Sequence, residues 1–280
     1  AEKNRQGGEK LMMLVPEQYS FETEKAILHK AGPVRAASIQ VYSFTRLAEA
    51  VFREEGGFAG RRLTDGGRRI LMSSAIAASE DHLEVYAGAA RSGRISDLML
   101  TAVNEMKLCA ISPKQLAETA EMIGGRGLGK KLSELALIYG AYEALVEASY
   151  LDSRDDLPRL ADRLETSDFF EGATVAVDSF EGFTAQEIRV LEQILRRAET
   201  VLFSLCTDGL PEDGTGLFAL VNRTRYRLQR LAEEHALAAA PRRNIGSRPG
   251  GGAAGIKEQG SQKDAARRAD VAQVVARGVG

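Results

Sequence analysis

Short apolar segments alternate with amphipathic segments over the first 57 residues. The run at residues 11–15 is continuously apolar and ends at Pro16, which favours a buried strand that stops there. A segment of helix-forming composition follows, and Gly32-Pro33 ends it. Next come β-branched and aromatic residues, and then a second amphipathic segment that stops at Gly56-Gly57. The pattern predicts strand, helix, strand and helix at residues 11–15, 20–32, 37–44 and 45–57.

Only helical patterns occur between residues 64 and 164. Ser112 followed by Pro113 is the favoured order of cap and first residue at a helix start. We expect this stretch to be a helical insertion. Its longest predicted helix carries apolar side chains at helical spacing, namely Leu132, Leu135, Tyr139, Tyr142 and Val146.

Strands return after this stretch. Residues 173–180 predict a strand, residues 185–198 an amphipathic helix and residues 200–205 another strand. This order is typical of a βαβ unit, which implies a parallel sheet covered by helices. The predicted fold class is therefore α/β, with a parallel sheet and an all-helical insertion. Further helices are predicted at residues 217–237 and 263–280.

The chain divides into five predicted parts. It has 280 residues and begins with Ala1 shortly before the first predicted strand, so we expect it to be cut from a longer protein. The parts are a first α/β segment, the helical insertion, the resumed α/β domain, a flexible glycine-rich linker and the truncated start of a following domain: residues 1–63, 64–165, 166–243, 244–262 and 263–280.

The charge balance argues against a globally basic nucleic-acid-binding protein. The chain has 37 basic and 39 acidic residues, for a net charge of -2, so any DNA contact must be local. Its two cysteines, Cys109 and Cys206, are too few for a disulfide framework, which predicts a cytoplasmic location. No apolar run approaches the ~20 residues that a membrane helix needs, and we expect no membrane partner.

The segment GGRGLGKK at residues 124–131 matches the G-x-x-x-x-G-K pattern of phosphate-binding loops. Such a loop needs Ser or Thr next to hold Mg²⁺, whereas Lys131 stands in that place. The loop also follows a strand, whereas the residues before Gly124 predict a helix. The segment therefore favours a helix–helix connection over a nucleotide site.

Asp178 lies near the end of the strand predicted at residues 173–180. An acidic residue at this end of a parallel strand lies in the crevice where open α/β sheets bind nucleotides. In P-loop ATPases this residue holds Mg²⁺, and in helicases a glutamate usually follows it, where this chain has Ser179. Asp178 is a candidate for a degenerate position of Mg²⁺ and ATP. The alternative is an ordinary cap of the next turn.

The second predicted strand leads into the segment VYSFTRLAEA. There Ser43, Thr45 and the backbone N–H groups can meet a phosphate, and Phe44 can stack on a base. With Arg46, these residues are the candidate DNA-binding site, and we expect a DNA strand to run over the strand ends near them. The alternative for Phe44 is an ordinary place in the core.

Basic residues gather in several short clusters. One of them places Arg223, Arg227 and Arg230 on the same face of a predicted helix. A solvated surface is the ordinary explanation, and a DNA backbone contact is the alternative, which the salt dependence of binding tests. The other clusters are Arg61-Arg62, Arg68-Arg69, Lys130-Lys131 and Arg196-Arg197.

Six collinear segments resemble the N-terminal part of the AddB family, the B subunits of bacterial AddAB helicase–nucleases. The resemblance implies a P-loop, superfamily-1 helicase-like motor domain with a helical insertion. The segment VYSFTRLA lies where such helicases contact single-stranded DNA. The segment VDSFEGFT lies at the Mg²⁺-and-base motif, of which only Asp178 and Phe180 match. The six segments are residues 14–24, 41–52, 61–72, 105–116, 131–157 and 177–205.

The resemblance also implies what this chain lacks. The family's phosphate-binding loop and its strand lie before the strand at residues 11–15, and its nuclease domain and iron–sulfur cysteines lie far towards the C-terminus. Neither Cys109 nor Cys206 is one of those ligands. Full-length members imply Mg²⁺, ATP and a 4Fe-4S cluster. For this chain we expect no cofactor, no metal and no catalytic residue of its own.

The implied function is part of a helicase–exonuclease that processes double-strand breaks for homologous recombination. The implied partners are an AddA-like helicase–nuclease subunit, in a heterodimer, and single- and double-stranded DNA. We expect this chain to supply scaffold, DNA contact and recognition of a regulatory sequence. Two alternatives stay open: an autonomous NTPase that uses Lys130, and a protein-interaction module that binds no DNA.

Overall fold

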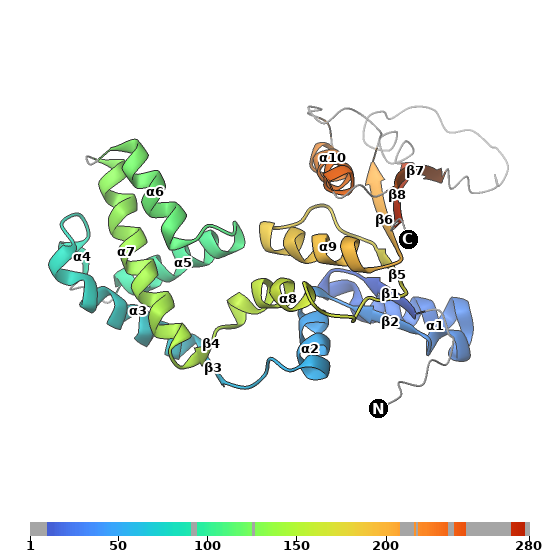
Figure 1. Ribbon diagram of the computed structural model, residues 1–280, viewed down its shortest axis with the longest axis horizontal. Helices are drawn as coiled ribbons and strands as arrows, with labels where there is room; N and C mark the ends of the chain where they lie inside the picture. The colour runs from blue at the N-terminus through green and yellow to red at the C-terminus, as the bar shows by residue number, and fades with distance from the viewer. Residues whose placement is uncertain are drawn as a thin grey trace, which may run out of the picture. The chain divides into compact units, whose positions relative to one another are not determined.

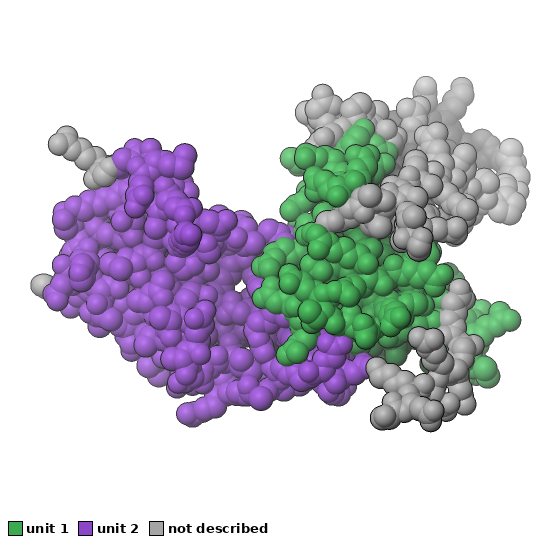
Figure 2. Space-filling model, in the orientation of Figure 1, with its two compact units in different colours: residues 1–49, 161–183, 188–280 green, residues 50–160, 184–187 purple. Residues whose placement is uncertain are grey.

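Two compact units make up the chain (Figure 2). Unit 1 comprises residues 1–49, 161–183 and 188–280, and unit 2 comprises residues 50–160 and 184–187. The computed structural model describes residues 10–90, 94–124, 127–207, 216, 218–234, 238–244 and 270–277.

The strands are short and the helices fill most of the described chain (Figure 1). The strands are β1 (Lys10–Leu14), β2 (Ile39–Tyr42), β3 (Arg61–Arg62), β4 (Tyr150–Leu151), β5 (Ala173–Val177), β6 (Thr200–Thr207), β7 (Ala238–Asn244) and β8 (Asp270–Arg277). The α-helices are α1 (Ser20–Ala36), α2 (Phe44–Glu55), α3 (Asp65–Ser79), α4 (Ala87–Ala90), α5 (Arg94–Leu108), α6 (Pro113–Ile123), α7 (Leu128–Glu147), α8 (Asp156–Leu164), α9 (Ala185–Arg197) and α10 (Ala219–Glu234). Short 3₁₀ turns lie at Glu17–Tyr19, Glu80–His82 and Ser153–Asp155.

A six-stranded sheet with the order β2-β1-β5-β6-β8-β7 lies in unit 1. Strands β2, β1, β5 and β6 are parallel, which confirms the predicted α/β class with a parallel sheet. Strands β8 and β7 add antiparallel neighbours. The prediction of a helix at residues 263–280 is wrong for residues 270–277, the part that the structure describes. This valine-rich run pairs with β6 as a strand. Apart from Asn244, the predicted linker at residues 244–262 lies outside the described residues.

The two faces of the sheet differ in burial. In β5, Ala173, Val175 and Val177 are buried, whereas Thr174 and Ala176, on the other face, are half-buried. The crossovers from β1 to β2 and from β5 to β6 run in opposite directions across the sheet. Right-handed connections therefore place α1 and α9 on opposite faces. Helix α9 has a fully buried apolar side, made by Val190, Leu191, Ile194 and Leu195.

Helix α1 ends its first part where the sequence predicts. Gly32 has φ 75° and ψ 164°, a backbone conformation that glycine adopts readily, and it breaks the helical path before Pro33. The chain then makes one further turn to Ala36. Ser20 is the only buried residue of α1, so this helix covers its face of the sheet loosely.

Helices α3, α5, α6 and α7 build the core of unit 2. Ser112 caps α6 as predicted, and its hydroxyl accepts from the Gln115 backbone while the Gln115 side chain accepts from the Ser112 backbone. Apolar residues at helical spacing in α7 face this core, which confirms the predicted helix. The buried residues of the unit 2 core include Met72, Ile76, Val103, Tyr139, Tyr142 and Val146.

A small sheet that no sequence pattern predicts joins β3 and β4. Arg61 pairs with Tyr150 and Arg62 with Leu151 in parallel register. The pairing holds the chain that enters the helical region beside the chain that leaves it. Among the described residues, no helix is long and apolar enough to cross a membrane.

Candidate functional site

The carboxyl ends of the four parallel strands lie along one side of the sheet, which we call the strand-end edge. From β1 the chain crosses to β2 in one direction, and from β5 it crosses to β6 in the other. The order therefore reverses between β1 and β5. Open α/β sheets bind ligands outside the carboxyl ends at such a reversal. The strand-end edge is the candidate functional site of unit 1.

Backbone hydrogen bonds hold the segments at this edge together. The Asp178 N–H donates to the Leu14 carbonyl at 3.0 Å, and the Val15 N–H donates to the Tyr42 carbonyl at 2.9 Å. Asp178 is half-buried at the reversal point, where the sequence predicts it. Ser179 follows with φ 67°, a left-handed conformation that turns the chain sharply away from β5.

A cavity of about 410 Å³ lies beside Asp178, between α1 and the sheet. Glu22 and Lys30 of α1 line it together with Asp178. Two carboxyls against one ammonium give it no excess of positive charge to attract a triphosphate. Among the described residues, no three His, Cys, Asp or Glu side chains are grouped as metal ligands. Asp178 by itself does not make a Mg²⁺–ATP site, and no hydrolytic step follows from this geometry.

Ser43 lies just beyond β2 and caps α2. Its hydroxyl accepts a hydrogen bond from the Arg46 backbone N–H at 3.2 Å, and its carbonyl accepts from the Leu47 N–H at 2.8 Å. The side chain is buried. Ser43 therefore positions the start of α2 at the strand-end edge.

Phe44 is the centre of a cluster of three aromatic rings. Its side chain is only 7% exposed. Its ring meets Phe180 edge-on at 5.7 Å and Phe183 at 6.4 Å between centroids, and these two rings are 4.8 Å apart. Phe180 and Phe183 are themselves partly exposed. Phe183 was not among the predicted site residues, because its contact with Phe44 depends on the turn after β5.

Thr45 and Arg46 are exposed at the first turn of α2. The Arg46 guanidinium donates to Glu24 Oε1 of α1 at 2.7 Å, and the two side chains are 43% and 44% exposed. An exposed pair of this kind is worth about 0–1 kcal/mol. It therefore opens at little cost when another anion approaches the guanidinium.

The GGRGLGKK segment connects two helices, as predicted. Gly124 ends α6 and Gly127 precedes α7, while residues 125 and 126 lie outside the described residues. Lys130 forms an ion pair with Glu84. The strand that a phosphate-binding loop must follow is replaced by α6. This arrangement does not support the NTPase alternative.

Most of the basic clusters found in the sequence carry ion pairs. Arg62 pairs with Asp156 at 3.0 Å, Arg69 with Asp97 at 2.9 Å, and Arg196 with Glu192 at 2.9 Å. These guanidiniums are neutralised locally. In α10, by contrast, the Arg230–Glu234 pair spans 3.7 Å, and Arg223 and Arg227 form no ion pair with another described residue.

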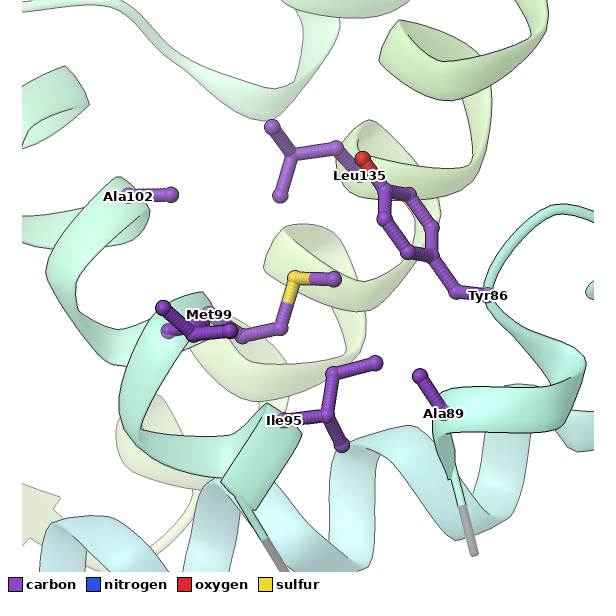
Figure 3. A pocket seen from close by; sticks show the side chains of 7 residues that line it. Tyr86, Ala89, Ile95, Met99, Ala102 and Leu135 are labelled. Carbon is purple, nitrogen blue, oxygen red and sulfur yellow. The ribbon is translucent and has the colours of Figure 1, made fainter. Parts of the chain in front are cut away.

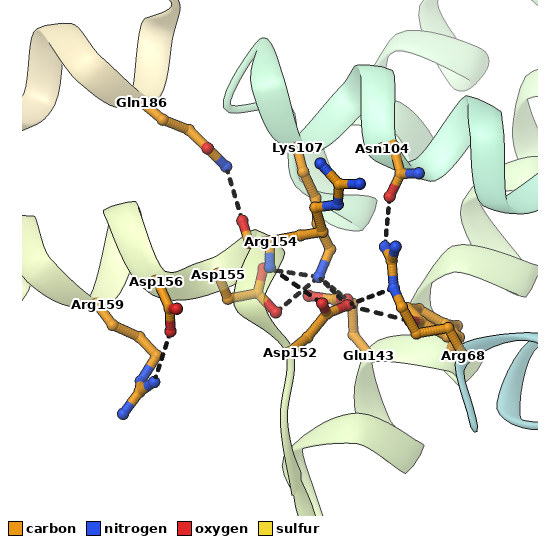
Figure 4. A network of polar contacts seen from close by, with 11 residues as sticks. Arg68, Asn104, Lys107, Glu143, Asp152, Arg154, Asp155, Asp156, Arg159 and Gln186 are labelled. Atoms are coloured by element: carbon orange, nitrogen blue, oxygen red, sulfur yellow. Dashed lines mark hydrogen bonds and ion pairs between the residues drawn. The ribbon is translucent and has the colours of Figure 1, made fainter. Parts of the chain in front are cut away.

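A buried charge network lies where the chain leaves the helical region (Figure 4). Lys107 of α5, only 4% exposed, contacts Asp155 at 2.6 Å and Glu143 at 2.8 Å. Asp152, fully buried, accepts from Arg68 at 3.2 Å and from the Tyr142 hydroxyl at 3.1 Å. The network fixes the segment after β4 against α3, α5 and α7. The sequence does not predict this network, because its members lie on helices far apart in the chain.

Burial and charge oppose each other in this network. Burial raises the pKa values of Asp155 and Glu143, and Lys107 only partly offsets this. Burial disfavours the charged form of Lys107, but Asp155 and Glu143 together raise its pKa. The ammonium therefore stays charged between carboxyls that hold their protons more tightly than usual.

A second cavity of about 300 Å³ lies among the helices of unit 2 (Figure 3). Tyr86, Ile95, Met99 and Leu135 line it, and the lining is almost wholly apolar. Nearby, the buried Glu134 carboxylate accepts backbone N–H groups of residues 84–86 at 2.9–3.1 Å. Burial alone would raise the pKa of Glu134, but these N–H groups outweigh it and leave the pKa lowered. The cavity offers no polar group suited to DNA.

Within the described ranges, neither cysteine lies in a group of three potential metal ligands. Cys109 and Cys206 are both free and exposed. A 4Fe-4S cluster takes four cysteine ligands, and the chain has two cysteines. The residues of this chain therefore do not fit that cluster.

Comparison with known proteins assigns this fold to a family. A family model described as "ADDB, N-terminal" matches residues 1–249. The chain is 36% identical over 227 residues to the B subunit of the ATP-dependent helicase/deoxyribonuclease of Thermoanaerobacter sp. (strain X514), which is 80% of this chain and 20% of that protein. It is 32% identical over 229 residues to the protein of the same name in Clostridium botulinum (strain Hall), with the same coverage. The chain thus spans about a fifth of the length of these curated relatives.

Proposed function

The chain belongs to the family of AddB N-terminal regions, and on that premise we propose that it contacts a DNA strand for a helicase–nuclease. The relatives it matches are named as B subunits of an ATP-dependent helicase/deoxyribonuclease. The proposed process is double-strand break repair by homologous recombination in the bacterial cytoplasm. The proposed partner is the A subunit of the same complex. We also propose the division of the chain into the five parts that the sequence predicts.

The observation that carries the proposal is the composition of the strand-end edge. The N-terminus of α2 lies there, with Thr45 and Arg46 exposed on its first turn. The rings of Phe180 and Phe183 lie beside it and are partly open to solvent. Guanidinium and backbone N–H groups bind phosphates, while aromatic faces stack on bases. Cationic and aromatic groups side by side suit a single strand, in which both phosphates and bases are accessible.

Each predicted residue then has a distinct part. Arg46 and Thr45 meet phosphates directly. Ser43 positions the first turn of α2. Phe44 packs against the rings of Phe180 and Phe183 on their buried side. These rings would hold the bases by stacking, which tolerates any sequence, so the proposed recognition of a regulatory DNA sequence needs contacts to base edges as well.

Asp178 takes the place of a Mg²⁺ ligand in a degenerate ATP position. Ser179 follows it where an active helicase has a glutamate, and the adjoining cavity is not cationic. We propose that ATP hydrolysis, with its Mg²⁺, belongs to other parts of the complex. The helicase-like motor fold and the phosphate-loop strand outside this chain are part of the same proposal.

The test compares three variants in binding to a fluorescein-labelled oligothymidylate. Arg46→Ala should weaken binding about 10- to 150-fold, since hydrogen bonds to charged groups are worth ~1.5–3 kcal/mol and about 1.4 kcal/mol is a factor of ten. Glu24→Gln should strengthen binding, because it frees the Arg46 guanidinium from its partner. Arg189→Ala is the matched control, since Arg189 is 46% exposed and pairs with Asp162 at 3.0 Å in the same unit.

Two results would contradict the proposal. Equal effects of Arg46→Ala and Arg189→Ala would show that only net charge matters. Absence of salt-dependent binding by the parent chain would favour the alternative, an interaction module that does not touch DNA.

A further inference from the structure

A second group of cations lines a groove along α10 in unit 1. The groove has a volume of about 490 Å³ and lies between α10 and Ile188 of α9. Arg223, Arg227 and Arg230 of α10 line it, together with Leu231 and Glu234. We call this surface the arginine groove.

The arginines form a row by helical geometry. Positions 223, 227 and 230 lie within about 60° around a helix of 3.6 residues per turn and span ~10.5 Å along its axis. In a double helix each strand places one phosphate per ~3.4 Å of axis, and an extended single strand spaces its phosphates more widely, so the row spans about two to three phosphates. The spacing therefore suits a polyanion with closely repeated charges.

Two of these charges have no ion-pair partner in the part of the chain that the structure describes. Among the described residues, neither Arg223 nor Arg227 forms an ion pair. Arg230 has only a loose one, at 3.7 Å from Glu234, with side chains 77% and 60% exposed. The arginines at positions 62, 69 and 196, by contrast, have carboxylates at 2.9–3.0 Å. The arginine groove thus keeps a positive charge that the arginines at positions 62, 69 and 196 lose to their carboxylates.

A hydrogen bond connects this groove to the strand-end edge. Thr224, adjacent to Arg223, donates from its hydroxyl to the Glu181 carbonyl at 3.0 Å. Glu181 directly follows Phe180, one of the two partly exposed rings at the edge. Buried residues of α10, including Leu228, hold the helix in this position. The hydrogen bond therefore holds the N-terminal half of α10, where the row of arginines begins, against the turn that carries Phe180.

We propose that the arginine groove binds the phosphate backbone of single-stranded DNA that continues from the strand-end edge. This inference rests on the proposed function, because the ligand is the same strand. The guanidiniums of the arginine groove contact phosphates and make no sequence-specific contact with bases. The groove supplies affinity and direction to the strand, whereas the edge supplies the base contacts. An acidic protein segment is the competing ligand, and the continuity with the aromatic cluster favours DNA.

The experiment measures oligothymidylate binding by the whole chain between about 50 and 200 mM NaCl. The double variant Arg223→Ala/Arg227→Ala should flatten the slope of log K against log salt by about 1.4, or ~0.7 per lost phosphate contact. The parent should then lose about sevenfold more affinity over this range than the variant does. Glu234→Gln should strengthen binding. Arg196→Ala, an exposed arginine outside the groove, should leave the slope unchanged.

A charge-preserving variant separates binding from folding. Arg223→Lys/Arg227→Lys should keep the slope of the parent, since the slope counts phosphates neutralised. An unchanged slope in the double alanine variant would overturn the proposal. If Arg46→Ala weakens binding in that case, the proposed function still stands. A flattened slope together with an inert Arg46→Ala would support the groove and contradict the edge.

The competing ligand is tested in the same assay. The DNA assignment would be overturned if the parent bound polyglutamate more tightly than oligothymidylate and the double alanine variant lost this affinity for polyglutamate. A parent chain without salt-dependent DNA binding would overturn it as well.

Discussion

Four consecutive residues at the start of α2 have three different environments. Ser43 caps the helix, Phe44 is packed under two other rings, and Thr45 and Arg46 face solvent. The sequence predicted all four as DNA contacts, because each residue type suits a nucleic acid. Which of them faces outward depends on how α2 is rotated against the core. That rotation is set by Phe180 and Phe183, which lie far away in the sequence.

Phe44 therefore provides a residue-scale prediction. Phe44→Ala removes a buried ring and should lower the free energy of unfolding by about 3–5 kcal/mol. Phe44→Leu should retain most of the stability, because it fills much of the same space. Urea unfolding measures both variants. Unchanged stability together with a loss of ~1–3 kcal/mol in DNA binding would instead place the ring directly under a base.

At the scale of elements, helices with clear ends were predictable and short pairings were not. The cap at Ser112 and the break at Gly32 are local features, so α6 and the first part of α1 follow from a few residues each. The two-residue pairing of β3 with β4 joins segments far apart in the chain and has no local pattern. The valine-rich run of β8 suits helix and strand alike until β6 is present as a partner.

The network around Lys107 is expected to hold the elements of unit 2 together. Lys107→Ala should lower the free energy of unfolding by about 3–5 kcal/mol at neutral pH, because it leaves buried carboxylates without their cation. Lys114→Ala is the control, since that lysine is exposed and its pair with Glu118 spans 3.9 Å.

The loss should diminish in acid. Burial raises the folded-state pKa values of Asp155 and Glu143, so folding favours their neutral forms as pH falls through those values. Protonated carboxyls no longer need the ammonium. Urea unfolding of the parent and the variant at several pH values measures this, and a loss that grows in acid would contradict it.

At the scale of the whole molecule, the net charge of -2 conceals an uneven distribution. Many arginines and lysines are neutralised by nearby carboxylates in both units. Arg223 and Arg227 of α10 have no ion pair with another described residue, and the Arg46 guanidinium is held only by a weak, exposed pair with Glu24. Composition alone predicted that a DNA contact must be local, but the pairing of charges required the structure.

The division into two compact units leads to a last prediction. Phe44 belongs to the packing of unit 1, whereas Lys107 belongs to the network of unit 2. Mutations without shared partners usually add within about 0.3–0.5 kcal/mol. The double variant Phe44→Ala/Lys107→Ala should therefore lose the sum of the two single losses. Calorimetry should also show each single variant lowering a different transition. A coupling energy well above ~0.5 kcal/mol, or one transition shifted equally by both changes, would mean that the two units unfold as one.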